Sequence, residues 1–274
     1  MTVKLRIPNV LSIAGSDPSG GAGGQADIKT FAAFRCYGMA AVTALTVQNT
    51  QGVLRVEPVA PELVAAQIDV IFADSEVAAV KIGMLTTAEI AEAVASSLAR
   101  AGARNIVLDP VLAATRGAGL SGAGLAAAIV ARLLPLATLV TPNLGEAATL
   151  TQTPLAHDTD AMAEQARALV GLGARAALVT GGHLAGAPFD MLCDDAGIGR
   201  FHGQRVETRN VHGTGCALSS AIAAGLAQGE TLIDAIAGAK AWLEEALAAS
   251  DALRVGRGAG PPHHFHRVWR DGSA

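Results

Sequence analysis

His212-Gly213-Thr214-Gly215-Cys216, followed at once by the apolar run 217–224, is the stretch that decides how this chain is interpreted. Two glycines let a backbone approach a ligand closely, and the N-terminus of the helix that follows suits an anion such as phosphate. A thiol at this position is expected to have a pKa below the free value of ~8.5. Together these features suit phosphoryl transfer. The alternative is an ordinary glycine turn before a packed helix with a buried, inert cysteine.

Outward from this stretch, short apolar runs typical of strands alternate with amphipathic segments typical of helices. The predicted strands are 10–15, 40–48, 77–82, 105–109, 138–141 and 176–180. The predicted helices are 24–35, 61–73, 87–100, 122–134, 159–172, 214–228 and 232–253. Such alternation is typical of βαβ units on a mostly parallel sheet with helices on both faces.

Two apolar runs, 189–193 and 198–206, break this rhythm on either side of Asp194-Asp195-Ala196-Gly197. They predict an antiparallel hairpin at the edge of the sheet. No linker, low-complexity block or repeat interrupts the sequence. The predicted fold class is therefore α/β, a three-layer α/β/α arrangement in which residues 1–274 form a single domain.

The amino-acid composition excludes some classes of binding partner. Of the 274 residues, 51% are hydrophobic and 3% aromatic, and the formal net charge is −4. Few aromatics and no basic excess argue against nucleic-acid and anionic-membrane partners. Three widely spaced cysteines imply no disulfide framework, and the sequence shows neither a signal peptide nor an apolar membrane span. A cytoplasmic location is expected.

Polar and glycine-rich residues follow six of the predicted strands. They are Gly15-Ser16-Asp17, Gln48-Asn49, Gly83-Met84, Asp109-Pro110, Pro142-Asn143 and Gly181-Gly182-His183. In open α/β sheets ligands bind beyond the carboxyl ends of the strands, so these residues predict one binding rim. The glycine-rich loop 17–24 has neither the P-loop spacing nor the dinucleotide-binding pattern in its usual setting.

Several side chains near this rim have two interpretations. Asp27 either caps its helix or accepts a hydrogen bond from a substrate hydroxyl. The amide of Gln48 is either satisfied by backbone groups or reads the edge of a polar heterocycle. Glu146 is either a capping-box carboxylate after Asn143 or, with Asp109, part of a Mg²⁺ site beside phosphates. Oxygen ligands favour Mg²⁺ over zinc at such a site.

Sequence blocks in order along nearly the whole chain carry a resemblance to a known family. They are 14–23 (AGSDPSGGAG), 25–27 (QAD), 43–45 (TAL), 48–50 (QNT), 81–85 (KIGML), 108–111 (LDPV), 141–147 (TPNLGEA), 181–183 (GGH), 212–216 (HGTGC) and the tail 260–266. The chain resembles the hydroxymethylpyrimidine/phosphomethylpyrimidine kinases of thiamine biosynthesis, within the ribokinase-like superfamily. The resemblance implies a central sheet between helical layers, a pyrimidine acceptor, ATP with Mg²⁺, and a homodimer.

The resemblance also assigns roles by position. It places Gly15, Asp27, Gln48, Met84 and Val111 at the pyrimidine pocket. It implies nucleotide contacts from Asn143, Glu146, Thr180 and Thr214, and a metal organised by Asp109 and Glu146. Gly213 and Gly215 would form an anion hole, and Cys216 stands where many sugar kinases of the superfamily carry a catalytic Asp. Cys216, as a thiolate, is expected to accept the proton of the hydroxymethyl group.

Three positions depart from the family pattern. Gly24 replaces a larger apolar residue, Thr115-Arg116-Gly117-Ala118 replaces a Lys-Ser-Gly-Asp pattern, and Thr180 stands where a Lys often precedes Gly-Gly-His. Arg116 is expected to supply some of the missing positive charge near the phosphates. The alternative assignment is a pyridoxine/pyridoxal kinase. Some of those enzymes carry a second Cys after Asp-Pro-Val, whereas residues 112–115 here read Leu-Ala-Ala-Thr, which favours a pyrimidine.

Overall fold

The computed structural model describes residues 6–112, 124–182 and 188–269. Strands within these ranges form one nine-stranded sheet in the order β3-β2-β1-β4-β5-β6-β7-β8-β9. The strands are β1 (Asn9–Ser16), β2 (Tyr37–Asn49), β3 (Gly52–Pro58), β4 (Val77–Ile82), β5 (Ile106–Leu108), β6 (Leu139–Val140), β7 (Ala177–Thr180), β8 (Phe189–Asp194) and β9 (Gly197–His202). The α-helices are α1 (Gly23–Ala33), α2 (Pro61–Asp74), α3 (Ala88–Ala101), α4 (Leu125–Ala128), α5 (Leu144–Thr151), α6 (Thr159–Gly171), α7 (Thr214–Ala227) and α8 (Leu232–Ala248).

The sheet is parallel in its centre and antiparallel at both edges. Strands β2, β1, β4, β5, β6 and β7 run parallel, and β8 and β9 form the predicted antiparallel hairpin. The predicted α/β fold with a mostly parallel sheet and an edge hairpin is therefore confirmed. Strand β3, which pairs antiparallel with β2, was missed. Its exposed Leu54, Arg55 and Glu57 leave a pattern too weak to distinguish a strand from a loop.

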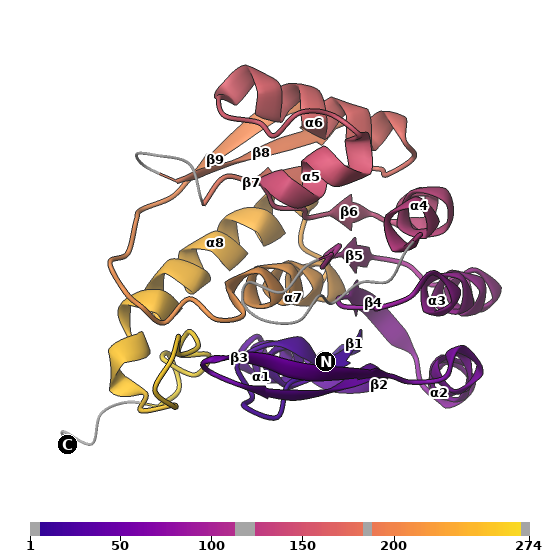
Figure 1. Cartoon of the computed structure of the whole chain (residues 1–274), viewed down its shortest axis with the longest axis horizontal. Coiled ribbons are helices and arrows are strands. Elements are labelled where there is room, and N and C mark those ends of the chain that lie inside the picture. Colours follow the sequence, from indigo (N-terminus) through magenta and orange to yellow (C-terminus); the bar gives the residue numbers. More distant parts are fainter. Residues whose placement is uncertain (1–5, 113–123, 183–187, 270–274) are drawn as a thin grey trace, which may run out of the picture.

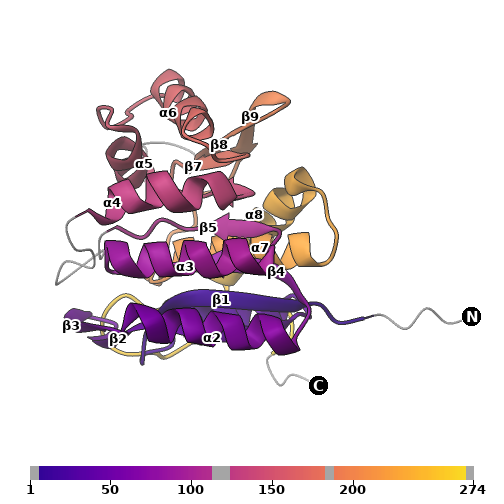
Figure 2. The same cartoon turned by 90° about the vertical axis from the view of Figure 1, so that its right-hand side faces the viewer.

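Alternation along the strands separates two cores on the two faces of the sheet. Leu11 and Ile13 of β1 face a core that includes residues of α2 and α3. Val10 of the same strand faces a core shared with α1, α7 and α8. Helices α2, α3 and α4 lie on one side of the sheet, with α7 and α8 on the other (Figures 1 and 2). A side-chain period of two residues produces this three-layer arrangement.

Some predicted boundaries are wrong. The helix predicted over 122–134 begins outside the described residues. After α4 it continues as a wider π-helical turn (Ile129–Leu133) and then as a tighter 3₁₀ turn (Leu134–Leu136). Pro135 cannot donate a helical hydrogen bond. The last helix ends at Ala248 rather than residue 253, and β9 ends at His202 rather than residue 206.

The direction in which strands are added to the sheet reverses at β1. The chain leaves β1 to build β2 on one side, and β4 lies on the other side of β1. Ligands in open α/β sheets bind at such a reversal of strand order. Helix α7 packs on β1, β4 and β5, so the pentapeptide before it belongs to this part of the fold. In the described residues, no helix is both long and apolar enough to span a membrane.

Candidate active site

The N-terminus of α7 is shaped by close contact with the glycine-rich loop. Gly213, its N-cap, has a left-handed backbone with φ of 78°. A Cβ on Gly213 would lie 1.9 Å from the carbonyl oxygen of Gly21, so only glycine fits this contact. Among described residues, no side chain caps this helix end, and a Cβ on Gly215 would meet no atom within 4 Å. The Thr214 N–H donates to the carbonyl oxygen of Val211 at 3.4 Å, whereas the N–H of Gly215 is available to an anion.

Beside α7 lies a fully buried set of charged and hydroxyl groups. Ser12 of β1 and Lys81 of β4 are register partners. The carboxylate of Asp27 accepts hydrogen bonds from Ser12 Oγ at 2.6 Å and Lys81 Nζ at 3.0 Å. It also accepts one from Ser220 Oγ of α7 at 2.7 Å. Although burial lowers the pKa of Lys81, the charge of Asp27, its hydrogen bond with Lys81 and the charges of the neighbouring acidic groups together raise that pKa above its usual value, so the ammonium stays charged.

Asp27 does not cap its helix. Helix α1 begins after Ala22 and has no side-chain cap. The Asp27 side chain is 0% exposed, and its two oxygens are taken by protein donors. The expected hydrogen bond from a substrate hydroxyl to Asp27 stays a prediction. Its carboxylate ties α1, β1, β4 and α7 together.

Asp109 and Cys216 occupy the side of this cluster nearest the α7 terminus. Asp109 Oδ2 lies 3.8 Å from Lys81 Nζ and accepts a hydrogen bond from Ser219 Oγ at 3.2 Å. The thiol of Cys216 hydrogen-bonds with Asp109. Burial raises the pKa of Cys216 to about 12, even though the Lys81 charge acts in the opposite direction. The predicted low thiol pKa is therefore wrong, because the helix terminus does not compensate for desolvation beside two carboxylates.

Asn143 and Glu146 form the predicted capping box at the start of α5. The Asn143 N–H donates to Glu146 Oε2 at 2.9 Å, and the Glu146 N–H donates to Asn143 Oδ1 at 3.0 Å. Burial raises the pKa of Glu146 to about 8, and the negative charge of Asp109 adds to this effect. Burial also raises the pKa of Asp109. Two carboxylates that oppose each other's ionisation are a donor set that fits a divalent cation.

An apolar wall forms where β1, β4 and β5 end. A Cβ on Gly15 would lie 2.2 Å from Cε of Met84, so these two residues are in direct contact. Met84 packs with Val53 of β3, and Val111 adjoins the same cluster. Gln48 is the register partner of Val53. The structure thus brings together four of the five residues assigned to the pyrimidine pocket.

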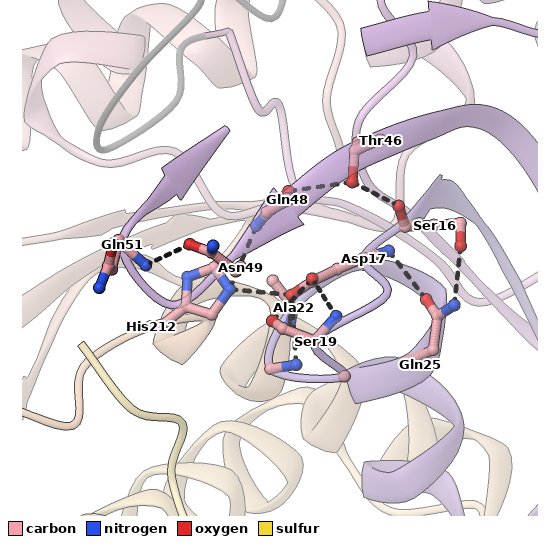
Figure 3. A network of polar contacts seen from close by, with 12 residues as sticks. Ser16, Asp17, Ser19, Ala22, Gln25, Thr46, Gln48, Asn49, Gln51 and His212 are labelled. Carbon is pink, nitrogen blue, oxygen red and sulfur yellow. Dashed lines mark hydrogen bonds and ion pairs between the residues drawn. The ribbon is translucent and has the colours of Figure 1, made fainter. Parts of the chain in front are cut away.

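Gln48 is joined to the glycine-rich loop through His212 (Figure 3). His212 Nε2 lies 3.2 Å from the side-chain nitrogen of Gln48 and 2.9 Å from Oδ2 of Asp17. Asp17 also accepts hydrogen bonds from N–H groups of the loop it begins, including those of Ser19 and Ala22. This arrangement makes one hydrogen-bonded unit of the loop, β2 and the residue before Gly213.

Sequence reasoning assigned no role to Asp17, Lys81 or His212. The pattern Asp17-Pro-Ser19 could have signalled the turn that Asp17 closes, since Asp commonly bonds to the backbone two residues on. A lysine within the apolar strand β4 could have signalled a buried charge pair. No local signal links His212 to Asp17, which lies 195 residues away.

The remaining predicted contacts lie on the same rim or outside the described residues. Thr180 ends β7 and forms a backbone bridge with Asn143, next to the capping box. Thr214 is the first residue of α7. The segment with Arg116, and His183 of the Gly-Gly-His block, lie outside the described residues, so the expectation for Arg116 stays a prediction.

A glycine-capped helix N-terminus without a side-chain cap, set at the carboxyl edge of this sheet order, defines the chain as a kinase of the ribokinase-like fold. Solved structures agree. The pyridoxal kinase of Bacillus subtilis in its ADP complex superposes with a TM-score of 0.87 and 34% identity, covering 96% of this chain and 99% of that one. A phosphomethylpyrimidine kinase of Clostridium difficile 630 gives a TM-score of 0.77 and 36% identity, covering 88% and 99%.

The chain belongs to the phosphomethylpyrimidine kinase family. The sequence model of that family matches residues 17–263. A hydroxymethylpyrimidine/phosphomethylpyrimidine kinase of Rhizobium meliloti strain 1021 is 53% identical over 262 residues, which is 95% of this chain and 98% of that protein. The resemblance read from the sequence blocks is confirmed.

Proposed function

We propose that this chain transfers the γ-phosphoryl group of ATP to 4-amino-5-hydroxymethyl-2-methylpyrimidine and then to the resulting monophosphate, in thiamine biosynthesis. Membership of the family supports the reaction class. The observation that carries the proposal is the available N-terminus of α7, flanked by Cys216 and Asp109, close to the apolar wall of Gly15 and Met84. One end of the site suits phosphate and the other an apolar ring.

The α7 terminus is the element that we propose binds the transferred group. The backbone N–H groups at Gly213 and Gly215 would stabilise negative charge on the phosphoryl oxygens, and Thr214 would contact the nucleotide. Asn143, Glu146 and Thr180 lie where β6 and β7 end and would contact the nucleotide. Phosphoryl transfer is largely dissociative, so fixed positioning and charge stabilisation supply most of the catalysis.

Mg²⁺ would be held by Asp109 and Glu146. Their oxygens are hard ligands, and a divalent cation would offset the burial and the neighbouring negative charge that raise both pKa values. In the described residues, no group of three or more His, Cys, Asp or Glu is gathered for a metal. The other ligands would therefore be phosphate oxygens and water. When bound, the ion neutralises charge on the phosphates.

Cys216 would lie beside the acceptor hydroxyl and would accept its proton only as the thiolate, the thiolate becoming a thiol as the alkoxide oxygen attacks phosphorus. Its thiol keeps its own proton in the free protein, because the pKa is about 12. Base assistance is therefore the smaller part of catalysis in this proposal. Gln48 would pair with the amino group and ring nitrogen of the pyrimidine, since a side-chain amide matches that edge with one donor and one acceptor.

The test is ATP- and Mg²⁺-dependent phosphorylation of the aminopyrimidine beside pyridoxal, with mono- and diphosphate products resolved. Pyrimidine diphosphate as the main product is expected. Pyridoxal phosphate alone would overturn the proposal and favour vitamin B6 salvage, the alternative that the structural similarity to the pyridoxal kinase of Bacillus subtilis supports. Removal of Mg²⁺ with a chelator should abolish ADP release.

A homodimer formed through the β2–β3 edge is also proposed. Leu45, Val47 and Leu54 are 58%, 54% and 75% exposed. Exposed apolar side chains gathered on one edge usually mark an interaction surface. Leu45 and Val47 alternate along β2 with Thr46 and Gln48 of the site network, so a second copy can cover one face and leave the other open. Light scattering should give a dimer, and Val47→Asp should shift it towards monomer.

A cytoplasmic location is proposed as well. Cys36, Cys193 and Cys216 are all free thiols, as is typical of proteins in a reducing compartment. Fractionation of cells that express the tagged protein should recover it with cytoplasmic markers.

A further inference from the structure

Five groups form one continuous hydrogen-bonded chain along the acceptor pocket (Figure 3). Thr46 Oγ1 lies 2.8 Å from the carbonyl oxygen of Ser16 and 3.2 Å from one end of the Gln48 amide. The other end of that amide lies 3.2 Å from His212 Nε2, which lies 2.9 Å from Asp17 Oδ2. This series of hydrogen bonds ends at the Ser16 carbonyl and at the Asp17 carboxylate, which both only accept hydrogen bonds. These two ends therefore fix which groups between them donate.

The Ser16 end determines what Thr46 can offer to Gln48. A carbonyl oxygen has no proton to give, so the single hydroxyl proton of Thr46 points to Ser16 at the shorter distance of 2.8 Å. Thr46 Oγ1 can then only accept from Gln48. The amide end beside Thr46 must therefore be the NH₂ group, because an oxygen there would face an oxygen without a shared proton.

The Asp17 end gives the same answer independently. Burial would raise the pKa of Asp17, but hydrogen bonds from His212 and Ser19 outweigh it and hold that pKa below its ordinary value. The carboxylate is thus ionised, and His212 Nε2 must carry a proton to donate to it. A protonated Nε2 cannot accept a hydrogen bond. The amide end beside His212 must therefore be the oxygen of Gln48, which shares that proton.

We infer that His212 is a specificity-determining positioning residue, which holds the Gln48 amide with its oxygen towards His212 and its nitrogen towards Thr46. This inference exchanges the nitrogen and oxygen of the Gln48 amide relative to the contacts drawn in Figure 3. The two ends of an amide are distinguished by their hydrogen-bond partners, and here two separate partners agree on the exchange. The inference rests on the proposed function in one respect, that Gln48 faces the pyrimidine.

This orientation selects one order of donor and acceptor on the ring. The 4-amino group is next to the carbon that carries the hydroxymethyl group, and His212 directly precedes the N-cap of α7. With the hydroxymethyl group at α7, the amino N–H meets the amide oxygen and the ring nitrogen accepts from the amide N–H. A 4-oxo analogue has a carbonyl and a ring N–H in the reverse order. It would place two acceptors and two donors against each other.

The test compares the amino and 4-oxo pyrimidines in wild-type protein and in His212→Phe. Sites built to hydrogen-bond one group reject its mismatched analogue strongly, so wild type should prefer the amino compound by about 10²-fold or more in kcat/KM. Without the His212 proton the amide is free to turn, and the preference should fall below about 10-fold. The change should appear mainly in KM.

Two further variants separate orientation from general damage. His212→Gln keeps an N–H donor and should restore most of the preference. His157→Phe, at a side chain that is 85% exposed, should leave it unchanged. A purely structural role for His212 would lower the rates for both pyrimidines equally and alter the KM for ATP. An unchanged amino-to-oxo ratio in His212→Phe would overturn the inference.

A measurement without substrate keeps the inference testable if the proposed function fails. In ¹⁵N NMR spectra of the free wild-type protein, His212 Nε2 should be protonated and hydrogen-bonded. A lone pair at Nε2 would overturn the inference whatever the kinetics show. Wild-type protein that phosphorylates neither pyrimidine would overturn the proposed function alone, since the NMR result still decides the orientation of Gln48.

Discussion

The site combines two polar regions of opposite character. Around Lys81, the charged cluster with Asp27 and Asp109 is buried between two strands and two helices. Around His212, the rim network with Gln48 and Asp17 lies on loops and a strand end, and its His212 side chain is 19% exposed. The first region contains full charges that only their partners neutralise. In the second region, His212 sets which end of the neutral Gln48 amide donates and which end accepts.

This difference indicates a division of labour. A buried charge that loses its partner leaves an uncompensated ion in a low-dielectric interior, so the charged cluster should control stability and the shape of the transfer site together. A half-exposed amide can turn or bind water at small cost. The rim network should therefore control which acceptor is recognised, with little effect on folding.

The largest effect is expected from Lys81→Met. The substitution leaves Asp27 and Asp109 buried without their shared cation, and should cost about 3–5 kcal/mol of the free energy of unfolding measured in urea. The double variant Asp27→Asn/Lys81→Met removes both members of the main pair and should recover part of this loss. A cost below about 1 kcal/mol for the single variant would remove the distinction between the two regions.

The next effect concerns Cys216, at the boundary of the charged cluster. Cys216→Ala should lower the rate of the first phosphorylation by about 10²-fold, near the low end for proton-transfer assistance. The second phosphorylation should suffer less, because a monophosphate with a second pKa of about 6 is mostly ionised already. Separate single-turnover assays of the two steps measure this, and equal losses would contradict the proposed base role.

The high thiol pKa can also be checked directly. With a pKa of about 12, the alkylation rate of Cys216 should rise steadily from pH 7 to pH 10 without a plateau, since only the thiolate reacts. Cys216→Ala identifies the signal that belongs to this thiol. A plateau near neutral pH would restore the sequence-based expectation of a helix-stabilised thiolate.

A smaller and more selective effect is expected from Gln48→Ala in the rim network. The KM for the aminopyrimidine should rise at least about 10-fold, because both hydrogen bonds from the Gln48 amide to the ring are lost. The KM for ATP and the free energy of unfolding should hardly change. Gln51→Ala, an exposed glutamine in the following turn, is the matched control. A loss of stability comparable with that of Lys81→Met would show that the two regions do not divide their roles.

The smallest effect is a pH dependence at Glu146. Its pKa is about 8 in the folded protein against an ordinary value of 4.5, so between these values the folded state holds a proton that the unfolded state releases. The contribution of Glu146 to stability is therefore complete below about pH 4.5 and is lost as pH rises through about 8. Glu146→Gln should flatten the wild-type decrease in Tm between pH 6 and pH 9. Added Mg²⁺ should stabilise wild type more at pH 8 than at pH 6, and the reverse order would exclude Glu146 as a ligand.

Much of the fold follows from patterns that are local in sequence. The apolar runs of β1 and β4, the helix periodicity of α3, and the glycines before α7 report backbone conformation and burial within a few residues. The capping box at Asn143 and the edge hairpin of β8 and β9 were predictable for the same reason. Strand β3 was not, since half of its side chains face solvent.

The sequence by itself determined the family, the sheet with its helical layers, and the rim on which the candidate residues lie. Only the tertiary structure decided that Asp27 is locked by Lys81 and Ser220, that the Cys216 thiol is neutral, and that His212 holds Gln48. A local pattern encodes torsion angles and the period of burial. The pKa of a thiol and the direction of an amide depend on groups brought close through space from distant parts of the chain, and no pattern within one segment contains them.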